Sequence, residues 1–297
     1  MIATLAAFGY VLSLVSPDAL LRALARASIL PFVAAMVLTV VALGLGSMRW
    51  SLLFTAFGAP HPPTFARLFH YYCVGFFYNT CVPGGVGGDL VRALASRRAW
   101  GAERAATAGI ATVLVERVFG LSGMLGLIAI VSLVHPLPVL GSAWLPGLLG
   151  LCAAVAPLVV LTAANWLTPR TPPLIAKLLA RLPVPVQLLP LLAAAAISLL
   201  TQLVPALSGY LIVSSIDPRA GLLDTLLIIP LASAAAFLPI TVSGAGVREA
   251  IFVTLYASVG VAADSALAAS LLVWCSQIAV AVLVGLIALV RPIDDPR

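Results

Sequence analysis

The sequence predicts an all-α membrane protein with about six full spans and two broken, re-entrant hairpins in an inverted repeat. Of the 297 residues, 62% are hydrophobic and only 9% are charged, and long apolar runs are separated by short polar segments. Two of these runs are interrupted by similar stretches rich in glycine and proline. Because the runs use nearly the whole chain, we interpret residues 1–297 as a single transmembrane domain.

The apolar runs are assigned by their length. A helix rises 1.5 Å per residue and the hydrocarbon core is about 30 Å thick, so a full span needs about 20 residues. Residues 2–16 are shorter than this, and we interpret them as a short or tilted first span because no basic segment follows Met1, as one would in a signal peptide. Five full-length spans are expected at residues 28–50, 104–134, 142–166, 187–215 and 262–290.

Between these spans lie two broken regions, residues 64–97 and 221–260, each with two apolar arms around a Gly/Pro break. The break PGGVGGDLVR, which begins at Pro83, and the break PITVSGAGVR, which begins at Pro239, share five of ten residues without a gap. The order of span, broken pair and span also recurs. We therefore predict an internal repeat of about 28–134 and 187–290.

The distribution of basic residues predicts how the chain is oriented. If both broken regions are re-entrant, ten basic residues face one side and three face the other. The ten are Arg49, Arg67, Arg97, Arg98, Arg104, Arg170, Lys177, Arg181, Arg291 and Arg297, and the three are Arg22, Arg26 and Arg219. The first side is then cytoplasmic, as is the N-terminus. The repeats are inverted, and the hairpin tips can meet near the midplane.

A basic amphipathic segment at residues 170–182 is predicted to form an interfacial helix on the cytoplasmic surface. Its leucines and one isoleucine lie on one face, and Lys177 and Arg181 are spaced four apart. An ordinary solvated linker helix would give the same pattern, so both interpretations stay open.

The breaks expose backbone N–H and C=O groups that lipid cannot satisfy, so they must be buried in protein or line a wet cavity. Glycine allows close approach there, and the arm that follows begins with free N–H groups suited to an anion. Asp89 is either an N-cap or a ligand or ion-pair residue. The candidate binding residues from the breaks are Asn79, Gly84, Gly85, Gly87, Gly88, Asp89, Ser243, Gly244 and Gly246.

Charged residues near the breaks form the rest of the candidate site. Arg92 and Arg248 occupy the same repeat position, and an arginine in mid-membrane costs about 2.5–3.5 kcal/mol. Its planar fork suits phosphate oxygens. Glu116 and Arg117 project about 100° apart on one helix, which favours different partners for each. Together with Glu249 these charges form either a closed network of structural ion pairs or a network that also opens to a ligand.

Four motifs in this order resemble the bacterial lysylphosphatidylglycerol synthase transmembrane, or flippase-like, family. They are MRWSLLFTAFG, GFFYNTCVPGGVGGDLVRA, TVLVERVFGL and PITVSGAGVREA, and the resemblance covers about residues 30–290. It implies a domain of the bacterial inner membrane that moves lipids between leaflets, with aminoacylated phosphatidylglycerol as the cargo of the fused form. It also implies roles for Asn79, Pro83, the glycine loop, Arg92, Glu116, Arg117, Gly244, Gly246, Arg248 and Glu249.

The function expected is that of a lipid flippase for a phosphate-bearing lipid: a phospholipid, an aminoacyl-phospholipid or a polyprenyl-linked glycolipid. No GxxxxGK[ST] motif for ATP occurs, and the soluble synthetase domain of the fused relatives is not found in the 297 residues, so we expect no enzyme activity and no catalytic residue. The alternatives are an assembly partner of an envelope lipid or glycan enzyme, and a lipid-phosphate transferase.

The partners expected are membrane lipids, with an anionic headgroup as cargo, and no nucleic acid. A homo-oligomer or an envelope-biosynthesis partner stays open. The four cysteines form no CxxC pair and the three histidines are scattered, so no metal and no cofactor are expected. The net charge of +6 follows from basic cytoplasmic loops and does not identify a cargo.

Overall fold

The computed structural model describes residues 15–81, 87–100, 105–135, 137, 144–172, 176, 184–236 and 246–290. Every regular element in these ranges is a helix, and they contain no strand. The all-α membrane class predicted from the sequence is confirmed. Most of the first apolar run at 2–16 lies outside the described residues, and of the linker segment at 170–182 only residues 170–172 and 176 are described.

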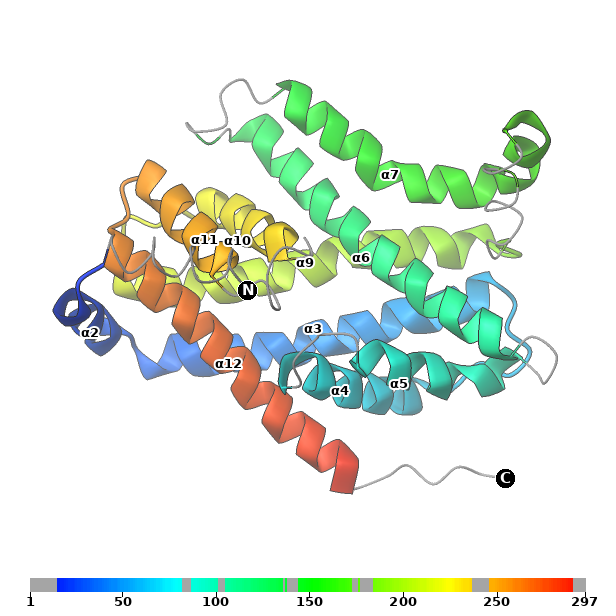
Figure 1. Cartoon of the computed structure of the whole chain (residues 1–297), viewed down its shortest axis with the longest axis horizontal. Helices are drawn as coiled ribbons and strands as arrows, with labels where there is room; N and C mark the ends of the chain where they lie inside the picture. The colour runs from blue at the N-terminus through cyan, green and yellow to red at the C-terminus, as the bar shows by residue number, and fades with distance from the viewer. Residues whose placement is uncertain are drawn as a thin grey trace.

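Five helices are long and apolar enough to cross a membrane. They lie at or near the five full-length spans that the apolar runs predict, and Figure 1 shows them as the long rods of the molecule. They are α3 (Ile29–Ala56), α6 (Ala105–Val134), α7 (Trp144–Leu167), α9 (Leu188–Ile216) and α12 (Ala263–Val290). A short helix that the sequence analysis did not predict, α2 (Pro17–Arg26), precedes them and begins at Ser16, whose hydroxyl oxygen accepts a bond from the Ala19 N–H at 3.3 Å.

Each broken region forms two short helices, as the Gly/Pro breaks predict. The first pair is α4 (Phe65–Cys81) and α5 (Gly87–Ser96), and the second is α10 (Leu222–Ala236) and α11 (Val247–Ser258). In Figure 1 the first pair lies at the end of the molecule where α3 ends, and the second pair lies at the opposite end, where α9 ends. The breaks themselves, 82–86 and 237–245, lie outside the described residues, and so do the tips that were expected to meet.

The helix contacts come in matched pairs around the central packing of α3 on α9. Helix α6 packs on α9 as α12 packs on α3, and α6 packs on α10 as α12 packs on α4. Two copies of one unit related by a two-fold axis would produce this pattern. The repeat and its boundaries stay a prediction, which this pairing supports. Helix α7, outside both repeats, packs mainly on α6.

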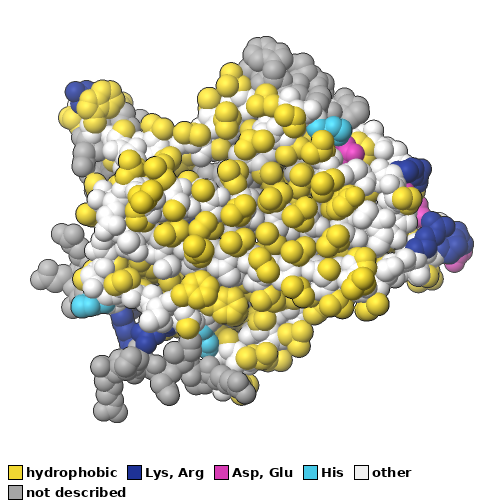
Figure 2. Space-filling model, turned by 180° about the vertical axis from the view of Figure 1, so that it is seen from behind, with side chains coloured by type: hydrophobic (Ala, Val, Ile, Leu, Met, Phe, Trp, Pro, Cys, Tyr) yellow, Lys and Arg dark blue, Asp and Glu magenta, His cyan; other side chains and the backbone are white. Residues whose placement is uncertain are grey.

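The outer surface is divided by polarity. Figure 2 shows a broad band of apolar side chains across the middle of one face, with charged and histidine side chains towards its two ends. Exposed side chains such as Ile29, Leu189 and Val290 are each more than 70% accessible. In a membrane protein such side chains contact lipid tails, and the charged ends contact headgroups and water.

Helices α4 and α5 touch backbone to backbone at two glycines. A Cβ atom on Gly88 would lie 2.0 Å from the carbonyl oxygen of Gly75, so any larger residue at position 88 would push α4 and α5 apart. The N–H of Gly88 donates to the side-chain oxygen of Asn79 at 2.9 Å, which fixes the start of α5 against the end of α4. This contact sets the position of every side chain on α5.

We therefore expect Gly88→Ala to lower the free energy of unfolding by about 1–3 kcal/mol, the usual cost of overpacking. The measurement is thermal or denaturant unfolding of the purified protein in detergent. Gly44→Ala is the matched control, because a Cβ at Gly44 has nothing within 4 Å and alanine favours the helix. Equal stability of the Gly88 variant and the wild type would contradict the close contact.

Candidate functional site

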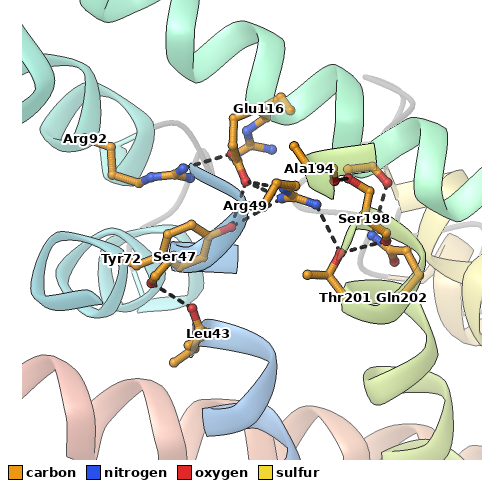
Figure 3. Close-up of polar contacts among 12 residues, drawn as sticks. Leu43, Ser47, Arg49, Tyr72, Arg92, Glu116, Ala194, Ser198, Thr201 and Gln202 are labelled. Atoms are coloured by element: carbon orange, nitrogen blue, oxygen red, sulfur yellow. Dashed lines mark hydrogen bonds and ion pairs between the residues drawn. The ribbon is translucent and has the colours of Figure 1, made fainter. Parts of the chain in front are cut away.

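A cluster of buried charges lies where α3, α4, α5, α6 and α9 meet (Figure 3). Its centre is the carboxylate of Glu116 on α6, whose side chain is 2% exposed. Arg49 on α3 and Arg92 on α5 both pair with it, and each of their side chains is 6% exposed. Buried charges are expensive unless they are paired and hydrogen-bonded, so this cluster depends on complete pairing.

Both oxygens of Glu116 are occupied. Oε1 accepts bonds from Nε of Arg49 at 3.1 Å, from Nη2 of the same arginine, and from the hydroxyl of Tyr72 at 2.9 Å. Oε2 accepts from Nη2 of Arg92 at 2.9 Å. Arg49 also donates through Nη1 to the hydroxyl oxygen of Thr201 on α9 at 3.0 Å. The carboxylate thus ties α3, α4 and α5 to α6.

Arg92 is held between two aromatic rings. Its guanidinium carbon lies 4.5 Å from the ring centroid of Trp50 and 4.2 Å from that of Tyr72, within the range of cation–π attraction. Gly75 makes room for its aliphatic part, since a Cβ there would lie 2.9 Å from Cδ of the arginine. Among the described residues, its buried Nε has no hydrogen-bond partner. The arginine therefore keeps one donor beyond what Glu116 uses.

The position of Arg49 corrects the sequence analysis, which placed it on the cytoplasmic side, at the end of a span at 28–50. Helix α3 continues to Ala56, and Arg49 is 5% exposed inside it. The reason is the apolar run SLLFTAF, which follows Arg49 and Trp50 and extends the buried helix by nearly two turns. That run is the sequence signal that could have identified the residue. With Arg49 inside α3, nine basic residues remain on the predicted cytoplasmic side and three on the opposite side.

A second ion pair lies towards the more exposed side of the cluster. Nη2 of Arg117 on α6 lies 2.5 Å from Oδ2 of Asp89 on α5, with side chains 37% and 19% exposed. The other oxygen of Asp89 is 3.8 Å from Nη1 of Arg92, beyond hydrogen-bonding distance. Asp89 is thus an ion-pair residue in the first turn of α5, and Glu116 and Arg117 do address different partners.

The cluster lines a cavity of about 230 Å³. Three arginines against the carboxylates of Glu116 and Asp89 leave a formal net charge of +1 among the paired groups. The cavity also has an amide from each of two helices, α4 and α9. Its polar lining is made by Arg49, Tyr72, Asn79, Arg92, Glu116, Arg117 and Gln202.

The described residues of the second hairpin, those of α10 and α11, do not line this cavity. Arg248 lines a separate space of about 80 Å³, and it pairs with its own neighbour Glu249 on α11. Oε2 of Glu249 accepts from the N–H of Gly246 at 2.7 Å. Within the described residues, Arg92 and Arg248 thus line two different cavities. Gln277, which also lines the smaller one, carries no charge.

The glycine loop is only partly described. Gly87 and Gly88 begin α5, and Gly246 precedes α11 with a φ of 86°, a conformation that favours glycine. Gly84, Gly85, Ser243 and Gly244 lie outside the described residues. Within the ranges that the structure covers, no group of three or more His, Cys, Asp or Glu side chains could hold a metal ion.

Sequence reasoning missed the site residues that carry no unusual signal. Trp50, Tyr72, Thr201 and Gln202 are common residue types in membrane helices. They join the site because α3, α4 and α9 pack beside α6. A glycine at position 46 is part of the same packing, since a Cβ there would overlap the ring of Tyr72. Only the three-dimensional packing identifies them.

We expect Glu116→Ala to destabilise the protein by about 3–5 kcal/mol, because it leaves Arg49 and Arg92 buried without their carboxylate. Unfolding in detergent measures the loss, and Ser122→Ala, a partly exposed position on the same helix, is the control with a change within about 0.5 kcal/mol. If the two variants were equally stable, the pairing would not hold the helices together.

Comparison with known proteins agrees with this geometry. The family described as the lysylphosphatidylglycerol synthase TM region matches residues 1–285, which is nearly the whole chain. No match was found among curated proteins. The match confirms the family that the four sequence motifs indicate, and it supports a membrane lipid-related function. The chain belongs to the lysylphosphatidylglycerol synthase transmembrane-region family.

Proposed function

We propose that the protein moves a phosphate-bearing lipid between the leaflets of the membrane, with its headgroup in the arginine-lined cavity. The observation that carries the proposal is the net charge of +1 around a cavity that α3, α6 and α9, three helices long enough to cross a membrane, line together with the short helices α4 and α5. An excess positive charge in a low-dielectric region attracts an anion strongly. A lipid phosphate is the anion most available at that depth.

The donors around the cavity suit phosphate oxygens. Arginine offers a planar fork of N–H groups, and Arg92 retains an unpartnered Nε. The side-chain oxygen of Asn79 accepts from Gly88, so its NH₂ group points away from that contact. Oδ1 of Asp89 is a buried acceptor that also lacks a partner, but Asp89 does not line the cavity, whereas Arg92 does. A phosphate in the cavity would accept from the free Nε–H of Arg92.

The two hairpins provide a route for alternating access. They enter from opposite ends of the molecule, and each packs on the last long helix of its own half, α5 on α6 and α11 on α12. We propose that exchange between two arrangements of these pairs opens the cavity to one leaflet and then the other. The partly exposed pair of Asp89 and Arg117 would separate when the first hairpin moves. The movement would be facilitated or ion-coupled, with Asp89, Glu116 and Glu249 as the candidate proton carriers.

The membrane and orientation are part of the same proposal. We propose the bacterial inner membrane, as the family implies, with the N-terminus in the cytoplasm. Nine basic residues against three still favour this orientation after Arg49 is assigned to α3.

The experiment is lipid movement in proteoliposomes that contain phosphatidylglycerol with a fluorescent acyl chain, where a membrane-impermeant reductant bleaches the outer leaflet. We expect wild type to move the lipid and Arg92→Gln to slow the initial rate about 10- to 100-fold, since a hydrogen bond to a charged group contributes about 1.5–3 kcal/mol. Arg92→Lys keeps the charge but loses the fork, so its rate should be intermediate.

Arg22→Gln on the exposed face of α2 is the matched control and should move lipid as wild type does. Correctly inserted wild type that moves no lipid would contradict transport. It would favour the alternative of an assembly partner, in which the ion pairs of Glu116 and Asp89 are structural only. An Arg92→Gln rate equal to wild type would contradict the role of the cavity.

A further inference from the structure

We infer that a second site, separate from the cavity around Glu116, binds the phosphate of a phospholipid headgroup at the membrane surface. The site is a cleft of about 960 Å³ beside the first hairpin. Its walls are the loop at residues 60–63, the first turns of α4, the end of α5 and the 3-10 helix η1 (Arg97–Trp100). We call it the basic cleft. No described residue lines both the basic cleft and the cavity around Glu116.

The walls of the basic cleft are held together by the protein itself. The N–H of His61 donates to the carbonyl oxygen of Ala99 at 3.2 Å, which joins the loop to η1. Three of the four loop residues are prolines, whose rings fix the φ angle. The side-chain oxygen of Thr64 accepts from the N–H of Arg67 at 3.4 Å at the start of α4. The cleft therefore does not need a ligand to form.

The lining offers donors that suit phosphate oxygens. Arg67 and Arg98 both line the cleft, and Thr64 and Tyr71 add hydroxyl groups. None of the described lining residues is acidic. Each arginine also takes part in another interaction, but a guanidinium has five N–H donors in a planar fork and can serve a phosphate as well. The chemistry that this lining recognises is thus an anion with several oxygens.

The position of the cleft favours a lipid as the source of that phosphate. Phe65 follows the loop and Leu94 precedes the lining residue Ala95, and each of these apolar side chains is 52% exposed. Figure 2 likewise shows basic and histidine side chains at this end of the apolar band. The polar lining therefore adjoins a lipid-facing surface, at the depth where headgroups lie. Basic pockets at this depth on the cytoplasmic side, where we predict Arg67 and Arg98, are typical sites for anionic headgroups.

A lipid in the basic cleft would contact the same two helices that line the central cavity. Tyr71 lines the cleft, and its neighbour Tyr72 lines the cavity from the same helix α4. Helix α5 in turn carries Arg92 into the cavity and Ala95 into the cleft. The bound lipid would thus lie against the hairpin that the proposed function requires to move. Binding itself does not depend on that movement, so the two proposals can fail separately.

Photocrosslinking with a lipid probe tests the site. The purified protein in neutral detergent is irradiated with phosphatidylglycerol that carries a diazirine at the glycerol end of one acyl chain, and labelled peptides are identified by mass spectrometry. We expect labels within residues 60–71 and 95–99. A diacylglycerol with the same photoreactive chain has no phosphate and should label these residues about tenfold less, because it lacks the charge-assisted hydrogen bonds.

The variants separate charge, space and location. Arg67→Gln with Arg98→Gln should reduce labelling of the cleft about tenfold or more. Ala95→Phe keeps both arginines and fills the cleft, so it should reduce labelling in the same way and decides the question if the double variant does not fold. Arg22→Gln with Arg26→Gln removes the same charge from the exposed face of α2 and is the matched control, which should label as wild type does.

Each contrary outcome overturns a stated part of the inference. Equal labelling by the diacylglycerol, or full labelling of folded arginine or Ala95→Phe variants, would overturn phosphate binding in the cleft. Glycerol phosphate that competes as well as unlabelled phosphatidylglycerol would overturn the lipid source in favour of a soluble phosphate. Loss of the cleft labels in Arg92→Gln would overturn the separation of the two sites.

The proposed function stands or falls on a different readout. Lipid movement in proteoliposomes without labels in the cleft would overturn this inference and leave transport intact. Labels in the cleft of a protein that moves no lipid would support the basic cleft and contradict transport alone.

Discussion

The charge pairing around the carboxylate of Glu116 is the constraint on which the rest of the structure depends. One buried acid on α6 holds an arginine from α3 and another from α5, together with the hydroxyl of a tyrosine from α4. In a membrane such charges are tolerated only when their partners meet at hydrogen-bonding distance. The nearby glycines at 46, 75 and 88 follow from this requirement, because larger residues would move the ring, side chain or backbone that positions the pairs.

The two hairpins make matching helix contacts but carry different arrangements of charge. Arg92 reaches across to another helix, and the cavity it lines is positive and has a volume of about 230 Å³. Arg248, at the matching position of the second break, pairs with Glu249 beside it, and the smaller space that it lines also contains the uncharged Gln277. The matched helix contacts are thus preserved while the charges are not. We interpret the first half as the one that binds the headgroup. The second half would take part in the exchange between two helix arrangements that alternating access requires.

The membrane spans and broken hairpins could be predicted from the sequence, because helix length in lipid is set by apolar run length and because Gly/Pro breaks end helices locally. The pairing of Arg117 with a different partner from Glu116 also follows from helix geometry. Arg49 was misassigned since a charged residue was taken as the end of a span that in fact continues to Ala56. Tyr72, Thr201 and the separation of Arg92 from Arg248 depend on long-range packing, which no local pattern contains.

The central claim is that the arginines around Glu116 contact a lipid phosphate, and solid-state NMR can measure this contact directly. The protein is reconstituted into phosphatidylglycerol with ¹⁵N-labelled arginine, and dipolar coupling between guanidinium ¹⁵N and lipid ³¹P is recorded for wild type and Arg92→Gln. The account predicts coupling to a buried guanidinium in wild type that disappears in the variant. Coupling only to exposed arginines, identical in both proteins, would contradict it.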